Sequence, residues 1–427
     1  MIRNVPPNRL FTSRLILLVL PCLVLISEPT LSQELSEPAA FIQTVLSRHP
    51  SLQRADELVR AAEFGLKASG LQPNPTLTIA ATAGDPGEDS NSLTQNFEIS
   101  GQPSLRHSVA RANLEASLQQ REAVRRQLIA STYRNWLELW KTQRLLELAQ
   151  LRNLLLEEMT RVANRRFEVG EISENEALRV TLAAAQAQTN LVSAEAEYAG
   201  ARQSAALLLG MEETDLESNP SEPTFLLSGL TQEAILASAM EHPEKRAQFH
   251  RLGAIELGAD LIQKERAPVL GLSVYRSSLY RSSLIRYQPL QQGVELSLSW
   301  PIVDWGSIRN RAEQKRAQAS AFRAQIDEAL LDMRQQLSKI WVRLQAAKKN
   351  RSILAQQADR YEELAREARV AYDVGLWSLT DVLQTEQTYR QARVQLLEAT
   401  AEAMNLELQI LERTGLSLPP EFLKEDL

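Results

Sequence analysis

The chain has 427 residues and a net charge of −6, and only 5% of its residues are aromatic. Alanine, leucine, glutamine, glutamate and arginine dominate the composition, which is typical of long helices and coiled coils rather than of a compact enzyme. Charges of both signs are mixed along the chain, so no basic face indicates binding to nucleic acid.

The N-terminal segment has the three parts of an export signal. Three arginines precede an apolar stretch at 15–26, and small residues lie just before Gln33. About 12 apolar residues are too few to span a bilayer as a helix. We predict that residues 1–32 are a signal peptide. The only cysteine, Cys22, lies inside it, so the mature chain would have no thiol chemistry.

Two helices and a strand pair are expected to follow the signal. The helices run from Glu37 to Arg48 and from Leu52 to Leu71, and Pro73-Asn74-Pro75 ends the second one. Apolar and polar residues then alternate, first at 76–81 and again around 97–99. This alternation indicates two short strands joined by a loop.

Two very long helical hairpins are predicted next. Residues 104–219 and 302–418 contain no proline, which would break a helix interior. Each window contains one aromatic-acidic-Val-Gly sequence, and a serine follows after two more residues. Glycine accepts the left-handed conformation that ends a helix, and serine caps the start of the next one. We therefore expect the hairpins to turn at 169–170 and at 374–375.

The same order of elements occurs twice in the chain. Pro75, for example, recurs as Pro268 at an offset of 193 residues, just before a second alternating segment. An ordered series of helix, strand pair and long hairpin indicates a tandem duplication. We predict a first repeat at 33–220, a second repeat at 221–418 and a C-terminal tail at 419–427.

The second strand pair has the alternation of a membrane barrel wall. In residues 294–300, Val, Leu, Leu and Trp share one face of the strand, and Glu and Ser share the other. A membrane barrel requires this pattern, because its outer face contacts lipid and its inner face lines a polar lumen. Aromatic residues near the strand ends predict an interfacial girdle formed by Tyr275, Tyr287, Trp300 and Trp305. The alternative is a soluble sheet with one buried face. Four strands cannot close a barrel, so the barrel hypothesis requires several copies of the chain.

These features together resemble the TolC family of outer-membrane efflux channels, from about Leu35 to Gly415. The strongest similarity is the segment YDVGLWSLTDVL at 372–383, with LERTG at 411–415 and SWPIVDWG at 299–306. The helix start at Gly101-Gln102 is loosely similar to that of metal-efflux members of the family.

The resemblance implies a mainly α fold with a small β part. Duplicated long helical hairpins would form a periplasmic α-barrel tunnel, with a mixed belt near its middle. Four strands per subunit would contribute to a trimeric, twelve-stranded outer-membrane β-barrel. The protein would then lie in the outer membrane, in contact with its lipid, and extend into the periplasm of a Gram-negative-type envelope.

The resemblance also assigns roles to the two hairpin turns. They would form the periplasmic tip that contacts an adaptor protein, through six residues: Val169, Gly170, Ser173, Val374, Gly375 and Ser378. Tyr372 matches a gate tyrosine and Asp381 matches an acidic residue at the tunnel entrance. As an alternative, Asp381 is a first-turn residue that interacts with the helix dipole. Gln384 replaces a second entrance aspartate, and Trp377 replaces a gate arginine.

No catalytic, metal-binding or cofactor-binding motif is predicted, so we expect a protein that is not an enzyme and needs no cofactor. The energy for transport would come from an inner-membrane pump that is joined through the periplasmic adaptor. The leading hypothesis is a passive exit duct of a tripartite efflux or type I secretion system. The rival hypothesis is a periplasmic coiled-coil scaffold that is not inserted in a membrane. Metal ions, drugs and polypeptides all remain open as the cargo.

Overall fold

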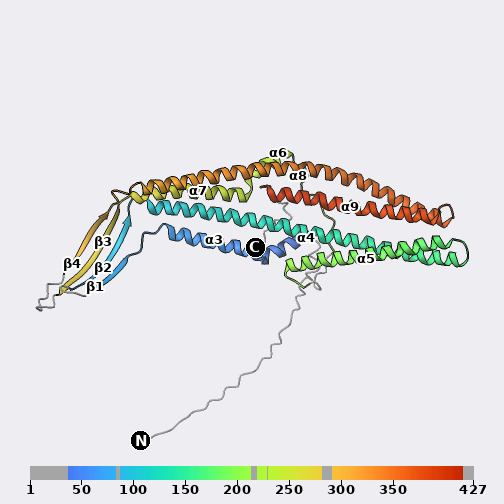
Figure 1. The fold of residues 1–427 in the computed structure, drawn as a ribbon, viewed down its shortest axis with the longest axis horizontal. Helices are drawn as coiled ribbons and strands as arrows, with labels where there is room; N and C mark the ends of the chain where they lie inside the picture. The colour runs from blue at the N-terminus through green and yellow to red at the C-terminus, as the bar shows by residue number, and fades with distance from the viewer. Residues whose placement is uncertain (1–36, 83–86, 213–218, 228, 281–290, 417–427) are drawn as a thin grey trace, which may run out of the picture.

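The computed structural model describes residues 37–82, 87–212, 219–227, 229–280 and 291–416. The predicted signal peptide, Tyr287 and the C-terminal tail lie outside these ranges. The molecule is elongated: long helices run side by side, and a curved sheet extends from one end of them (Figure 1). No helix in the described ranges has a stretch long and apolar enough to cross a membrane.

The first half of the chain contains two short helices, two strands and one long helical hairpin. Their bounds are α2 Pro38–Arg48, α3 Pro50–Ser69, β1 Thr76–Thr82, β2 Gly87–Glu98, α4 Gln102–Glu168 and α5 Glu174–Leu209. The second half repeats this order, with α6 Gln232–Ser238, η2 Ala239–Glu241, α7 Pro243–Gln263, η3 Lys264–Arg266, β3 Val269–Tyr280, β4 Gln291–Ser299, α8 Ser307–Asp373 and α9 Leu379–Arg413. The long helices α4 and α8 have 67 residues each, as the proline-free windows predict.

Equivalent histidines begin the corresponding helices of the two halves. The Nδ1 atom of His49 accepts a hydrogen bond from the backbone N–H of Ser51, at 3.2 Å. The Nδ1 atom of His242 accepts one from the backbone N–H of Glu244, at 3.3 Å. Each ring therefore satisfies a free donor at a helix N-terminus, which is a structural role.

The hydrophobic core lies near the middle of the long helices. Trp136 and Trp140 of α4 are at most 1% exposed, and they pack with Phe41 of α2 and with Met404 of α9. A second cluster joins α6 to α8 and α9. Short helices and the linker thus bind the two hairpins together at this level, which fits the expected mixed belt.

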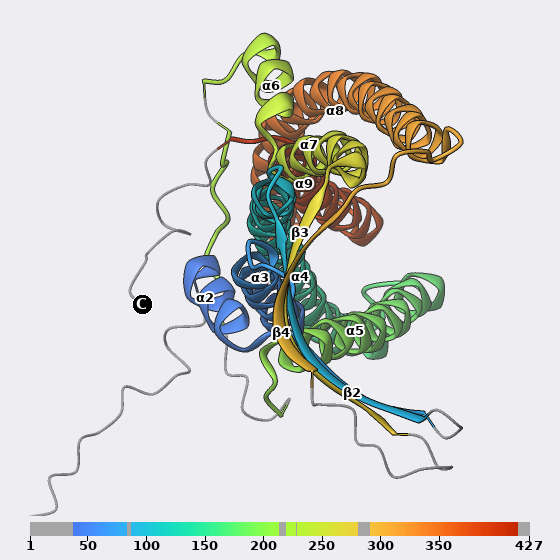
Figure 2. The same cartoon turned by 90° about the vertical axis from the view of Figure 1, so that its left-hand side faces the viewer.

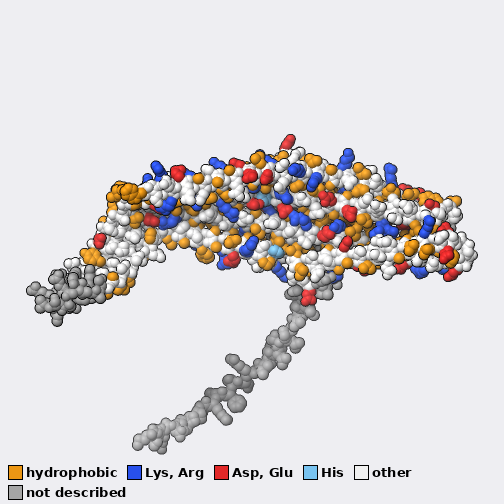
Figure 3. All heavy atoms as spheres, viewed as in Figure 1, with side chains coloured by type: hydrophobic (Ala, Val, Ile, Leu, Met, Phe, Trp, Pro, Cys, Tyr) orange, Lys and Arg blue, Asp and Glu red, His pale blue; other side chains and the backbone are white. Residues whose placement is uncertain are grey.

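The four strands form one antiparallel sheet in the order β1-β2-β3-β4, and the sheet curves away from the helices (Figure 2). The register aligns one apolar residue from each strand in a row: Leu77, Leu93, Val274 and Val294. All four side chains are between 49% and 71% exposed. On the side of the molecule that Figure 3 shows, few charged side chains lie on the sheet, whereas many cover the helical body. One face of the sheet is therefore apolar and uncovered.

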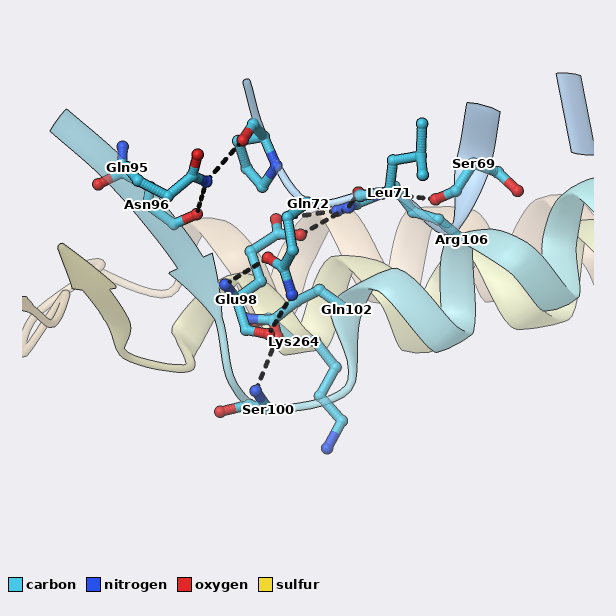
Figure 4. Close-up of polar contacts among 11 residues, drawn as sticks. Ser69, Leu71, Gln72, Gln95, Asn96, Glu98, Ser100, Gln102, Arg106 and Lys264 are labelled. Atoms are coloured by element: carbon cyan, nitrogen blue, oxygen red, sulfur yellow. Dashed lines mark hydrogen bonds and ion pairs between the residues drawn. The ribbon is translucent and has the colours of Figure 1, made fainter. Parts of the chain in front are cut away.

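Arg106 of α4 fixes the sheet to the helices at the junction. Its guanidinium donates hydrogen bonds to the carbonyl oxygens of Ser69 and Leu71 and pairs with the Glu98 carboxylate, with a shortest N–O distance of 2.6 Å (Figure 4). Gln72 also exchanges two hydrogen bonds with the backbone of Glu98. One side chain thus joins the end of α3, the end of β2 and the start of α4.

Candidate functional site

The two hairpin turns lie together at the end of the molecule opposite the sheet (Figure 1). We define the first tip as residues 166–173 and the second tip as residues 371–378. In the first, the N–H of Gly170 bonds to the carbonyl of Phe167 and the N–H of Glu171 to that of Arg166. The second tip has the equivalent pair of bonds at Gly375 and Leu376. This is the Schellman motif, which satisfies the last carbonyl groups of a helix.

Glycine is required at the turn position of each tip. Gly170 and Gly375 both have a φ of 76°, in the left-handed region that L-residues with a Cβ rarely adopt. No neighbouring atom would lie within 4 Å of a Cβ added at either glycine. The requirement therefore comes from the backbone conformation and not from crowding.

A capping box begins the return helix at each tip. The Ser173 hydroxyl accepts from the N–H of Glu176, and the Glu176 carboxylate accepts from the N–H of Ser173 at 2.9 Å. The Ser378 hydroxyl and the Asp381 carboxylate make the same exchange, with the N–H of Ser378 3.1 Å from Oδ2. The serines predicted at these positions therefore cap α5 and α9.

The capping contacts also explain the electrostatics of Asp381. Hydrogen bonds from the hydroxyl and then the N–H of Ser378 hold the pKa of the Asp381 carboxyl below its ordinary value. This supports the alternative in which Asp381 has a local helix-capping role. Gln384, one turn further along α9, is exposed. Asp381 is exposed as well.

Tyr372, in contrast, contacts the other hairpin. It packs beside a small buried cluster of Ala163, Val180 and Leu379, to which three helices contribute. The guanidinium of Arg166 lies over the Tyr372 ring, 4.7 Å from its centroid. The buried Tyr372 hydroxyl has no hydrogen-bond partner among the described residues.

Two polar contacts near the tips also join the hairpins or stiffen one of them. The guanidinium of Arg179 on α5 donates to the Thr380 hydroxyl on α9, at 3.3 Å. Arg369 of α8 pairs with Glu386 of α9 at 2.5 Å. Arg166 and Arg179 were not among the site residues predicted from the sequence. Their basic charge within two turns of a predicted helix end was the only available signal.

Apolar side chains are exposed around both turns. Val169 is 70% exposed at the first tip, while Val374 and Leu376 are 65% and 79% exposed at the second. Trp377, where a gate arginine can occur, is 38% exposed. The predicted contact residues therefore form a partly apolar surface that no other part of the described chain covers.

The predicted girdle aromatics are divided by the sheet register. Trp300 and Trp305 follow β4 and are 60% and 94% exposed, and the Trp300 indole N–H donates to the carbonyl of Arg266. Tyr275 lies in the middle of β3, opposite Gly293, so it shares the polar face with Ser273 and not the apolar face with Val274. Its hydroxyl is 2.9 Å from the position of a Cβ added at Gly293. Tyr275 thus differs from the prediction because strand alternation directs it toward the polar face.

A family of known proteins matches the second half of the chain. Residues 238–415 match the family described as outer membrane efflux protein. No curated protein sequence matches the chain. The description of this family agrees with the predicted outer-membrane localisation.

Solved structures share the fold at low sequence identity. CusC superposes with a TM-score of 0.73 and 16% identity, covering 89% of this chain and 92% of CusC. VceC, an outer membrane protein of Vibrio cholerae, gives 0.70 and 17%, with coverage of 88% and 96%. The open state of the Neisseria gonorrhoeae MtrE outer membrane channel gives 0.70 and 17%, with 90% of both chains covered. The predicted fold class and the resemblance to the TolC family are confirmed.

Proposed function

We propose that this protein is the exit duct of a tripartite efflux or type I secretion system, because residues 238–415 match the outer membrane efflux protein family. The duct conducts substrate passively across the outer membrane. An inner-membrane pump delivers the substrate, and a periplasmic adaptor joins the pump to the tips.

The shape and chemistry of the tips are the main support for the proposal. Two rigidly capped turns present Val169, Val374 and Leu376 to solvent at the end furthest from the sheet. Exposed apolar side chains on two neighbouring turns at the end of a long, charged helical body favour a protein contact. The adaptor contacts the predicted set at these turns: Val169, Gly170, Ser173, Val374, Gly375 and Ser378.

The sheet supports assembly as a homotrimer. The strands β1 and β4 lie at its two edges, each with one side free of pairing partners in the described chain. Unpaired strand edges next to an exposed apolar face favour aggregation. Closure of a barrel pairs both edges. Three copies together close a twelve-stranded barrel whose apolar face contacts outer-membrane lipid. Trp300 and Trp305 then lie at the periplasmic boundary of the lipid.

Contacts between the hairpins support a gate at the tips. The Arg166–Tyr372 and Arg179–Thr380 contacts both tie the first hairpin to the second. Opening of the tunnel mouth requires the hairpins to move apart, so these contacts hold the closed state. Asp381 and Gln384 lie near the same mouth, where Asp381 supplies a negative charge and Gln384 is neutral.

Membrane fractionation of cells that express the full chain tests this function against the scaffold alternative. The protein should stay in the dense outer membrane after a wash with alkaline carbonate, and it should be a trimer with a measurable β signal in detergent. Release into the soluble fraction would contradict the duct and support the periplasmic coiled-coil scaffold.

A further inference from the structure

One arginine lies on the apolar face of the sheet. Arg276 of β3 is the only basic residue in the four described strands. It follows Val274 by two residues, so strand alternation places both side chains on the same face. The Arg276 side chain is exposed. A charge at this place needs an explanation, because the proposed function brings the face into contact with membrane lipid.

The strand register places two amide side chains beside Arg276. Its partners in the sheet are Asn91 of β2 and Gln292 of β4, and both side chains are exposed. Directly opposite residues on neighbouring strands have Cβ atoms about 5 Å apart. We call Asn91, Arg276 and Gln292 the polar row. Its guanidinium and two amide groups bring several N–H donors together on a small area of surface.

The donors of the polar row are not used by the protein itself. Among the described residues, the side chains of the row form no hydrogen bond or ion pair. The acidic residue of β4, Glu295, lies opposite Ser273 and therefore belongs to the other face. The donors are thus available to a ligand that approaches the apolar face from outside.

The polar row lies at the border of the apolar face that is remote from the helices. The neighbouring row toward the helices contains Val274 and Val294, and no charged residue lies on this face between the polar row and Trp300. Gln292 and Trp300 are separated by eight residues, or about 27 Å along a strand. A strand tilt of about 40° reduces this to about 21 Å across the membrane, close to the roughly 25 Å of an apolar barrel band.

This position selects the chemistry of the ligand. Trp300 lies at the proposed periplasmic boundary of the lipid, so the polar row lies at the opposite boundary, where lipid headgroups begin. A guanidinium matches the geometry of a phosphate group and can bind two of its oxygens at once. The exposed side chains of Val274 and Val294 can pack against the acyl chains of the same lipid molecule.

We propose that the polar row binds the phosphate group of a membrane lipid in the leaflet that faces away from the periplasm. Arg276 pairs with the phosphate, and the amides of Asn91 and Gln292 donate hydrogen bonds to its remaining oxygens. The inference rests on the proposed function, because it requires the barrel, and it identifies a class of lipid that the barrel binds. Each subunit of the trimer contributes one such site.

Native mass spectrometry of the full-length trimer in detergent tests the proposal. The trimer is titrated with dioleoylphosphatidic acid, and dioleoylglycerol, which has the same acyl chains without the phosphate, is the matched neutral lipid. Saturable binding of one phosphatidic acid per subunit is expected, with little binding of dioleoylglycerol. Arg276→Gln should weaken this binding by about tenfold, because a charge-assisted bidentate contact is lost. Arg276→Lys should weaken it less, because the charge remains.

Two variants control for nonspecific charge effects, and the trimer mass in each spectrum controls for folding. Arg360→Gln changes an exposed arginine of α8. Asp89→Asn changes an acidic residue that lies two positions beyond Asn91, opposite Ser278. Neither substitution should weaken the binding of phosphatidic acid. A tenfold molar excess of inorganic phosphate over the lipid should not displace it either.

Four results would overturn the lipid site and leave the duct intact. These are unchanged binding in Arg276→Gln, equal binding of dioleoylglycerol, an equal loss in either control variant, and displacement by inorganic phosphate, which would indicate a site for free anions. If the unmodified protein gave no trimer, the proposed function would fail as well.

Discussion

At the first tip Glu171 follows the turn glycine, whereas Leu376 has the same place at the second tip. The next residues also differ, because Ile172 packs beside the tip cluster while Trp377 is 38% exposed. The backbone hydrogen bonds of the two turns are nevertheless equivalent. The comparison indicates that glycine and serine set the geometry of both tips, and that side chains after the glycine make the second tip the more apolar surface.

The largest expected effect comes from loss of the turn geometry. Gly375→Val places a β-branched side chain at a φ of 76°, where residues other than glycine cost about 1–2 kcal/mol or more. The second tip should rearrange, and adaptor crosslinking and efflux should both fall to near background. Gly200→Ala is the matched control, since Gly200 lies within α5 and an added Cβ there would meet no atom within 4 Å. If the Gly375→Val variant still bound the adaptor normally, the second turn would not be part of the adaptor contact.

The next largest effect, a loss of adaptor affinity, should follow when one tip receives the charged or apolar residue of the other. Leu376→Glu gives the second tip the acidic residue of the first, and it should weaken adaptor binding by about tenfold or more if Leu376 is buried on docking. Glu171→Leu should have little effect or strengthen binding slightly. The dissociation constant of purified adaptor for each variant provides the measurement. If both substitutions reduced adaptor affinity equally, the two tips would contribute equally to adaptor binding, which would contradict the comparison.

Loss of the contact between the hairpins should have a smaller effect, which is an increase in the permeability of the closed channel. Arg166→Ala removes the cation over the Tyr372 ring, an interaction of about 0.5–2 kcal/mol. The closed state should lose stability, so uptake of a large antibiotic through the outer membrane should rise severalfold. Arg165→Ala, at the exposed neighbouring position, is the control. Equal permeability of both variants and the unmodified protein would remove this contact from the gate.

The smallest effect is expected from pH. The folded-state pKa of Asp381 is lower than the ordinary 3.8, and that of Glu176 is lower than the ordinary 4.5. Each capping contact thus stabilises its tip fully above the ordinary value and is lost as the pH falls through the folded value. Hydrogen exchange at the first turns of α5 and α9, corrected for intrinsic rates, should show constant protection from pH 8 to about pH 5 and weaker protection below about pH 4. A change in protection near neutral pH would contradict this assignment.

Both tips could be predicted from the sequence because their signals are local. The aromatic-acidic-Val-Gly sequence and the following serine contain the whole Schellman turn and the cap, so a short segment was sufficient. Alternation also predicts the apolar face of the sheet. The same alternation places Tyr275 on the polar face beside Val274, but the prediction relied on its position near other aromatic residues instead.

The contact between the two hairpins could not be predicted in this way. Arg166 and Tyr372 are far apart in the sequence, and they meet only because the two hairpins pack side by side.

Ion conductance across a planar lipid bilayer tests passive conduction most directly. The purified full-length trimer should give a steady conductance that needs no nucleotide, and Arg166→Ala should raise this conductance severalfold. If neither protein conducts ions after verified insertion into the bilayer, the passive duct would be contradicted.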